Sequence, residues 1–364
     1  MDGGNIFLTL LQKVAPEGVP AWVLALTAAV VGIAILVGFV SVLVMFAVWL
    51  ERKVSGHIQC RYGPMYAGGW HGWAQSVADG VKLLAKEDLI PLGADKPLFV
   101  LAPALMLAAI FGALAAMPLS PSVYFTNLNL GLFAILAMSS MTTIGVVMAG
   151  WASNSKWALY GSMREAAQVV AYEIPFGISL LVPLMVIGTF NLGEASARQA
   201  GWFGMHWVMF QNPFVLPAFL LFFTAALAET KRAPFDLPES ESELVAGFMT
   251  EYSGIRWSFF FLEEYAAMFL MSVVGAVFFL GGFESPLTHF ARESFGAGSV
   301  VHEVTAGVTL LLKAMFGIFL MMWLRWTLPR VRIDQVMSMG YKYLTPLALV
   351  CVLGAGAWEA IFHG

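Results

Sequence analysis

Long apolar runs, separated by shorter polar segments, dominate this sequence. A run of roughly 20 apolar residues is long enough to cross the hydrocarbon core of a membrane as a helix, whereas a barrel strand needs only about ten. Backbone in lipid must also satisfy its own hydrogen bonds, which a helix does within one segment. The runs that approach this length are Ala21–Leu50, Pro97–Pro118, Leu128–Trp151, Arg164–Thr189, Pro213–Glu229, Trp257–Phe283, His302–Trp326 and Tyr341–Ile361. The pattern predicts an all-α fold, a polytopic transmembrane helical bundle of about eight spans.

Composition supports this interpretation. The chain is 59% hydrophobic and 12% charged, whereas about a quarter of the residues in an average soluble domain are charged. Because no linker or internal repeat divides the sequence, residues 1–364 are expected to form a single integral membrane domain.

Basic residues are concentrated in alternate loops. One set of loops and adjoining span ends holds Arg52, Lys53, Arg61, Lys82, Lys86, Lys96, Lys156, Arg164, Lys231, Arg232, Arg256, Arg325, Arg330, Arg332 and Lys342. The other set holds only Lys13, Arg198 and Arg292. The positive-inside rule places the basic set in the cytoplasm, which puts both termini on the non-cytoplasmic side. Two loops on the basic side, about 51–96 and 230–256, are longer than simple connections require and are candidates for function.

The first long loop contains a predicted amphipathic helix. Its polar positions have the spacing i, i+4, i+7 and i+11, and apolar positions occupy the opposite side. The polar residues are Gln75, Asp79, Lys82 and Lys86, and the apolar ones are Val77, Val81 and Leu84. Such a helix either lies passively on the membrane surface or forms one wall of an entrance that faces the lipid.

The second long loop is acidic. Its carboxylates are Glu229, Asp236, Glu239, Glu241, Glu243 and Glu251. Ser240 and Glu243 have the spacing of a capping box, which predicts that a short helix starts there. Helix capping in a solvated loop accounts for Glu243, but it does not account for six acids beside hydrophobic spans.

Several ionisable residues fall inside or at the ends of predicted spans: Arg164, Glu165, Glu173, Glu263, Glu264 and Lys313. A charged side chain at the centre of a spanning helix costs roughly 2.5 to 3.5 kcal/mol. Glu165, Gln168 and Tyr172 share one stripe of the fourth span, so a polar track could enter the bilayer there. The acids either form a proton path or pair structurally with Arg164 or Lys313.

Several chemistries are excluded by the motifs. The sequence has no phosphate-binding Gly-Lys loop, no dinucleotide fingerprint, no cysteine cluster for iron and sulfur, and no histidine in the middle of a span for haem. We therefore expect no cofactor bound by this chain alone and no nucleic-acid partner. If electrons pass nearby, partner proteins hold the redox centres.

Particular stretches resemble the H subunit of proton-pumping NADH:quinone oxidoreductase, which is respiratory complex I; the mitochondrial counterpart is called subunit 1. The stretches are ERKVSGHIQCRYGP from Glu51, VADGVKLLAKEDLIP from Val77, SKWALYGSMREAAQVVAYEIP from Ser155, residues 228–254, FFLEEYAAMF from Phe260 and WLRWTLPRVRIDQVM from Trp323. They occur in the order found in that family.

The resemblance implies a subunit that forms much of the tunnel admitting quinone, its substrate, from the bilayer. The residues it implies for the tunnel are Arg52, Arg61, Asp79, Lys82, Lys86, Arg232, Asp236, Glu239, Glu241, Glu243 and Glu251. It implies a proton path that starts with Glu173, Glu229 and Glu264. The implied partners are peripheral-arm subunits, which hold the flavin, the iron-sulfur clusters and most of the quinone headgroup site, together with small and antiporter-like membrane subunits. The implied location is a bacterial inner membrane.

Two positions depart from the family pattern, because Glu165 and Glu263 stand where a small residue such as alanine is usual. Both enlarge the carboxylate track, which leaves open which acid of each pair titrates. Two alternative functions also stay open: the related membrane subunit of an energy-converting hydrogenase or formate hydrogenlyase, and a self-contained ion transporter. Neither the quinone type nor the proton stoichiometry follows from the sequence.

Overall fold

The computed structural model describes residues 20–238 and 241–362, except for the side chains of Trp202, Glu241 and Ser242. Its long helices are α2 (Ala21–Ile58), α4 (Lys96–Ala115), α5 (Gly131–Ala152), α6 (Lys156–Ile187), α10 (Val215–Glu229), α12 (Gly254–Phe279), α14 (Val300–Thr327) and α16 (Thr345–Phe362). Shorter helices are η1 (Trp70–Gly72), α3 (Gln75–Ala85), α7 (Leu192–Ala197), α8 (Gly201–Gly204), α9 (Val208–Gln211), α11 (Glu241–Leu244), η2 (Gly247–Met249), α13 (Pro286–Phe295), α15 (Ile333–Ser338) and η3 (Met339–Leu344).

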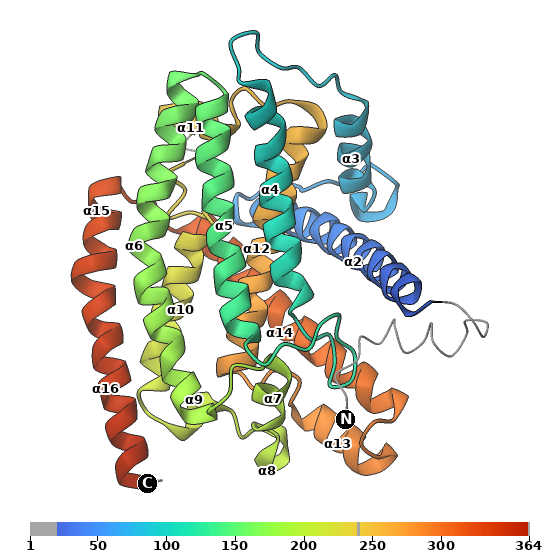
Figure 1. The fold of residues 1–364 in the computed structure, drawn as a ribbon, viewed down its shortest axis with the longest axis vertical. Coiled ribbons are helices and arrows are strands. Elements are labelled where there is room, and N and C mark those ends of the chain that lie inside the picture. The colour runs from blue at the N-terminus through green and yellow to red at the C-terminus, as the bar shows by residue number, and fades with distance from the viewer. Residues whose placement is uncertain (1–19, 239–240, 363–364) are drawn as a thin grey trace.

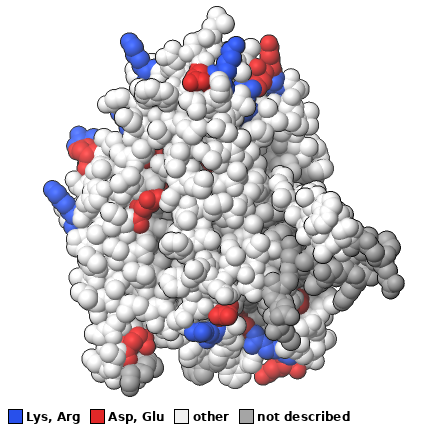
Figure 2. Space-filling view, viewed as in Figure 1, with Lys and Arg blue, Asp and Glu red and all other residues white. Residues whose placement is uncertain are grey.

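The predicted all-α membrane bundle is confirmed. Within the described residues, seven helices are long and apolar enough to cross a membrane. From α4 to α14 the chain runs alternately down and up the bundle (Figure 1). On the face seen in Figure 2, charged side chains lie in the upper half and at the lower end of the molecule, and a mostly uncharged belt lies between them. That belt is what a protein surrounded by hydrocarbon requires, because lipid cannot solvate charge.

The fifth predicted span is shorter than expected. It corresponds to α10, which has only 15 residues and is therefore roughly 22 Å long at 1.5 Å per residue. One face of α10 packs in the protein interior, where the ring of Phe222 lies 5.2 Å from the ring of Phe176 and 5.2 Å from that of Phe279. The chain can therefore stop short at Glu229 and turn back within the bundle.

The central helix of the bundle is α12. Its segment from Glu263 to Phe279 is buried throughout, which is why its sequence is apolar on every side instead of along one stripe. The α4–α5 pair illustrates how closely the helices approach each other, because a Cβ added to Gly145 would lie 2.3 Å from Met106 Cγ. Small residues at such contacts let helix backbones come together.

Three helix boundaries differ from the sequence expectation. Helix α2 continues past Leu50 to Ile58, so Glu51 lies inside a helix. Helix α6 begins at Lys156, which places Glu165 well inside the helix instead of at its end. Turns of helix from Ile333 precede the last span. Periodicity alone did not find these boundaries because charged residues at a span end are equally compatible with loop and helix.

The amphipathic helix predicted in the first loop is α3. It lies beside the upper end of α2 (Figure 1). Its apolar residues Val77, Val81 and Leu84 are exposed, whereas Asp79 faces α2 and forms an ion pair with Arg52.

The ammonium group of Lys313 closes the lower end of α12. Its Nζ atom donates hydrogen bonds to the carbonyl oxygens of Leu280 at 2.6 Å, Gly282 at 3.0 Å and Glu284 at 2.7 Å. It also lies 4.6 Å from the centre of the Trp207 ring. The three N–H donors of the ammonium group meet three backbone acceptors at the end of the helix, and the Glu284 carbonyl oxygen also accepts from the Trp207 indole at 3.3 Å. Lys313 therefore stabilises the turn after α12 and does not pair with a carboxylate of the predicted polar track.

The substitution Lys313→Met should destabilise the fold by about 2 to 4 kcal/mol, because the carbonyl oxygens of Leu280 and Gly282 lose the donor that Lys313 supplies. The measurement is the thermal unfolding midpoint of the purified chain in detergent, followed by helical circular dichroism. Lys342→Met, at an exposed position of η3, is the matched control. Equal midpoints for the two variants would contradict the role given to Lys313.

Candidate functional site

Two consecutive cations, Lys231 and Arg232, lie buried directly after α10. Lys231 adopts φ 55°, in the left-handed region, which costs a side chain other than glycine about 1 to 3 kcal/mol. This turn sends the chain back into the bundle, with Arg232 N donating to Leu227 O at 3.3 Å. The neighbouring carboxylates offset the strain, because they give both cations buried partners.

Lys231 connects α6 with α12. Its Nζ lies 2.8 Å from Glu165 Oε1 and 3.4 Å from Glu263 Oε2, and 5.5 Å from the centre of the Phe248 ring. Glu165 and Glu263 therefore share one lysine.

Arg232 connects α12 with α2. Its Nε lies 2.7 Å from Glu264 Oε1, and its Nη1 donates to both oxygens of Glu51 at 3.0 and 3.1 Å. Glu51 also accepts hydrogen bonds from Arg325 of α14 and from Tyr265, the latter at 2.5 Å. Burial lowers the pKa of Arg232, but the carboxylates of Glu264 and Glu51 outweigh it, so the pKa is held above its ordinary value.

Carboxylates outnumber cations in this buried network. The acids are Glu51, Glu165, Glu229, Glu263 and Glu264, and the cations are Lys231, Arg232 and Arg325. Glu229, the last residue of α10, interacts electrostatically with Glu173, Glu263 and Glu165, and its Oε2 is buried without a hydrogen-bond partner. Adjacent carboxylates repel one another when all are ionised. The network therefore has sites at which protons could be held or released.

A cavity of about 420 Å³ lies between α2, α3 and α12. Its walls are mainly apolar, and Arg52, Asp79 and Lys82 contribute charged groups. Asp79 Oδ2 lies 2.5 Å from Arg52 Nη1, and Asp79 Oδ1 lies 3.9 Å from Lys82 Nζ. Pockets of roughly 300 to 1,000 Å³ with apolar walls and few polar groups are typical of small-molecule sites.

Two aromatic side chains of α12, whose rings are tilted 54° to each other, connect this cavity with the buried network. Phe261 lines the cavity, and its ring centre lies 4.8 Å from that of Tyr265. Tyr265 in turn donates its hydroxyl to Glu51. A molecule in the cavity would therefore lie about one aromatic layer from the carboxylates.

The structure brings only some of the predicted residues together. Arg52, Asp79 and Lys82 line the cavity, whereas Arg61 is exposed and donates to Gln59 at 2.7 Å, and Lys86 is exposed at the end of α3. Neither Arg61 nor Lys86 lines the cavity.

The acidic loop is not one cluster. Among its described members, Glu229 joins the buried network, Glu243 pairs with the α6 residue Arg164, and Asp236 lies 3.0 Å from Arg330. Burial raises the pKa of Asp236 although the Arg330 guanidinium opposes that shift. Glu251 is half-buried. Glu239 lies outside the described residues, as does the side chain of Glu241. The predicted short helix is α11, but its predicted cap Ser240 is likewise not described.

The ion-pair partners of the buried acids are not the two cations, Arg164 and Lys313, that the structural alternative offered. Arg164 pairs with Glu243 in the loop and Lys313 binds backbone carbonyls, so Lys231 and Arg232 neutralise the acids instead. The sequence pattern marked both as loop cations, and the resemblance assigned Arg232 to the quinone tunnel, whereas the structure places Arg232 in the buried network and not in the lining of the cavity. Neither Glu51 nor Arg325 was indicated as a network member. These residues could have been suspected because they lie at the ends of apolar runs, where a charged side chain can point into the protein interior.

In the described residues no cluster of three or more His, Cys, Asp or Glu side chains is arranged to hold a metal ion.

Replacing Arg232 with methionine should destabilise the chain by about 3 to 5 kcal/mol, because Glu264 would remain buried without its ion-pair partner. Adding Glu264→Gln should recover part of the loss, since the uncompensated charge is then removed. The measurement is the thermal unfolding midpoint of both variants in detergent. The control is Arg332→Met, which removes a guanidinium that is largely exposed. If Arg232→Met unfolds at the temperature of Arg332→Met, the network does not stabilise the fold.

Comparison with known proteins identifies the family. A family model described as NADH dehydrogenase matches residues 31–355. A protein of Chlorobium luteolum, named as the H subunit of NADH-quinone oxidoreductase, is 43% identical over 361 residues, covering 97% of this chain and 94% of that protein. Proteins of the same name from Chlorobaculum parvum and Geobacillus sp. are 44% and 42% identical, covering 86% and 94% of this chain and 87% and 97% of theirs. The chain belongs to the NADH dehydrogenase family, alongside the H subunits of bacterial NADH-quinone oxidoreductases.

Proposed function

We propose that this chain is the membrane subunit of a proton-translocating NADH:quinone oxidoreductase that admits quinone between α2, α3 and α12 and couples its reduction to proton movement. The observation that carries the proposal is the proximity of an apolar cavity to a buried carboxylate network, with Phe261 and Tyr265 between them. A protein that senses quinone chemistry needs these two features next to each other.

The cavity suits the isoprenoid tail of a quinone. Its walls carry aliphatic and aromatic side chains such as Val44, Val48 and Leu262, which favour an apolar chain. The exposed apolar side of α3 lies beside it and gives that helix a surface for lipid. The Arg52–Asp79 ion pair ties α3 to α2 and fixes one wall. Of the two interpretations of the amphipathic helix, this arrangement favours the wall of an entrance.

The carboxylate network supplies the coupling element. Reduction of quinone to quinol takes up protons and changes the charge near the cavity. Because acids exceed cations in the network, a nearby change in charge shifts which carboxylates hold a proton. Glu165 and Glu263 compete for Lys231, while Glu229 and Glu173 continue the acidic track on α10 and α6. Antiporter-like partner subunits would receive the signal there.

The same proposal assigns orientation and partners. The end of the bundle with α3 and α11 carries the basic loops (Figure 1), which the positive-inside rule places in the cytoplasm of a bacterium, with the chain in its inner membrane. Peripheral subunits with flavin and iron-sulfur clusters would dock on that face. This chain contributes no redox centre of its own in this scheme and binds quinone as a substrate.

The cavity can be tested by filling it at Gly80. This glycine lines the cavity, and a Cβ added to it meets no atom within 4 Å, so Gly80→Leu should occupy space without disturbing the fold. In the assembled complex we expect the KM for a long-tailed quinone to rise roughly tenfold, as for one lost apolar contact of ~1.4 kcal/mol. Electron transfer from NADH to ferricyanide should not change.

The control for this test is Gly177→Leu on α6, where an added Cβ also meets no atom within 4 Å and which does not line the cavity. In Gly80→Leu, the KM for a quinone analogue with a short tail should rise much less than the KM for the long-tailed quinone. An unchanged KM for both quinones in Gly80→Leu would remove the cavity from the quinone path.

The coupling proposal is tested by Glu229→Gln, which keeps the shape of the side chain but cannot take up a proton at neutral pH. Quinone-coupled proton pumping by the assembled complex in vesicles should fall roughly tenfold or more, the scale of a lost proton-transfer group. The exposed Asp334 provides a control as Asp334→Asn. If Glu229→Gln and Glu173→Gln both pump at the rate of the control, this path is wrong.

A further inference from the structure

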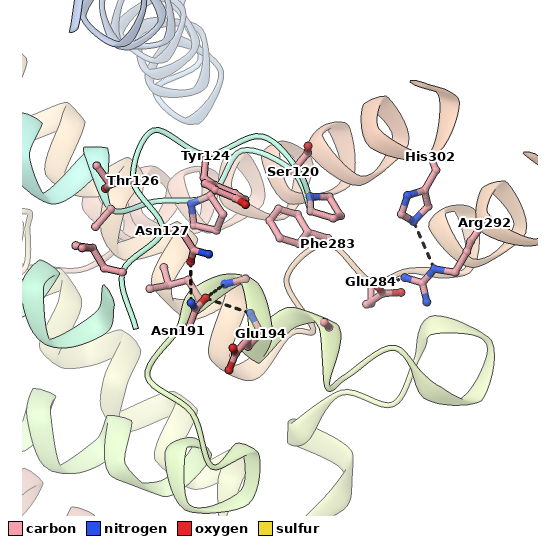
Figure 3. Close-up of a pocket in the computed structure, with 17 residues that line it drawn as sticks. Ser120, Tyr124, Thr126, Asn127, Asn191, Glu194, Phe283, Glu284, Arg292 and His302 are labelled. Carbon is pink, nitrogen blue, oxygen red and sulfur yellow. Dashed lines mark hydrogen bonds and ion pairs between the residues drawn. The ribbon is translucent and has the colours of Figure 1, made fainter. Parts of the chain in front are cut away.

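A second pocket, of about 290 Å³, lies at the end of the bundle opposite the quinone cavity. Its walls come from the segment that joins α4 to α5, from α7, from the turn after α12, and from α13 and α14 (Figure 3). Charged side chains gather at this lower end below the uncharged belt (Figure 2). The pocket therefore lies near the level at which lipid headgroups meet the protein.

One side of the pocket is a charged cluster with spare bonding capacity. Arg292 pairs with Glu284 through Nη2, and its Nε donates to His302 Nε2 at 3.4 Å. The Glu284 and His302 side chains are buried, yet Glu284 Oε2 and His302 Nδ1 have no hydrogen-bond partner. Because Nε2 accepts, a neutral His302 carries its proton on Nδ1, 4.0 Å from the nearest Glu303 oxygen. The wall thus offers an unmatched acceptor and an unmatched donor.

The rest of the pocket favours a ligand with a positive end. Glu194 contributes a second carboxylate to the lining, so acids exceed the one guanidinium when His302 is neutral. The aromatic side chain of Phe283 lies between the charged cluster and the α7 side, and that of Tyr124 lies above the α7 side (Figure 3). Aromatic faces attract cations. Arg292 keeps further N–H donors beyond its two bonds, and these suit a phosphate.

We propose that this pocket binds the headgroup of a zwitterionic aminophospholipid, with its ammonium group on Glu284 and its phosphate on Arg292. The paired carboxylate and guanidinium present two opposite charges side by side, which match the two charges of such a headgroup. The ammonium group supplies the donor that Glu284 Oε2 lacks, and a phosphate or glycerol oxygen supplies the acceptor for His302 Nδ1. Apolar lining residues such as Leu128 and Leu192 adjoin the glycerol and the first methylene groups.

The test uses the assembled complex reconstituted in nanodiscs that contain phosphatidylethanolamine, phosphatidylcholine or phosphatidylglycerol, with bound lipid counted by native mass spectrometry. Phosphatidylcholine has no N–H donor and phosphatidylglycerol has no cation, so both should bind more weakly. Glu284→Gln should weaken phosphatidylethanolamine binding by at least about tenfold, the scale of one charge-assisted hydrogen bond. Glu284→Asp, which keeps the charge, should recover part of the binding.

The matched control is Glu293→Gln on the same side of the bundle, because the Glu293 side chain on α13 is exposed and does not line the pocket. The proposal is overturned if Glu284→Gln retains as much phosphatidylethanolamine as Glu293→Gln, or if the wild-type complex binds all three lipids equally. The lipid comparison on the wild-type complex gives this answer even if Glu284→Gln does not assemble. Displacement by soluble phosphoethanolamine at equal concentration would support the ammonium site but overturn the lipid as its source.

Discussion

The structure depends on neutralising carboxylates that four helices bury in the interior of the bundle. Lys231 and Arg232 do this from a single turn after α10, because one reaches α6 and α12 and the other reaches α12 and α2. Removing the partner of a buried charge lowers the free energy of unfolding far more than removing an ion pair at the surface does. The relative positions of α2, α6, α10 and α12 are therefore fixed at this point.

That constraint also explains why α12 is central to the proposed function. One face of the helix places Phe261 in the cavity proposed for quinone, and its next residues place Glu263, Glu264 and Tyr265 in the charge network. A rigid helix with one side at the substrate and the other among titratable acids passes a change in charge over a short distance. No large movement is required, because the electrostatic effect of a charge extends over several ångströms in a low-dielectric interior.

The opposite end of the bundle is held by different chemistry. There Lys313 closes the turn after α12 with backbone hydrogen bonds, and Glu284, at the end of that turn, pairs with Arg292 at the second pocket. Both ends of α12 thus carry buried charge: the upper end serves the proposed coupling, and the lower end combines a structural lysine with a site suited to lipid.

The sequence by itself determined the membrane bundle, the amphipathic helix α3, and the family, because apolar run length, helical spacing and the motifs from Glu51, Ser155 and Ala228 are local properties of the chain. It identified Glu173, Glu263 and Glu264 as costly charges inside predicted spans and Glu165 as a charge at a span end, but the partners it offered for structural pairing, Arg164 and Lys313, are not the ones they have. Only the tertiary structure decided that Lys231, Arg232 and Glu51 turn inward to meet them, because residues at span ends can face either water or the interior. Whether such a side chain faces water or the interior depends on the packing of helices that are distant in sequence. No local sequence pattern encodes that packing.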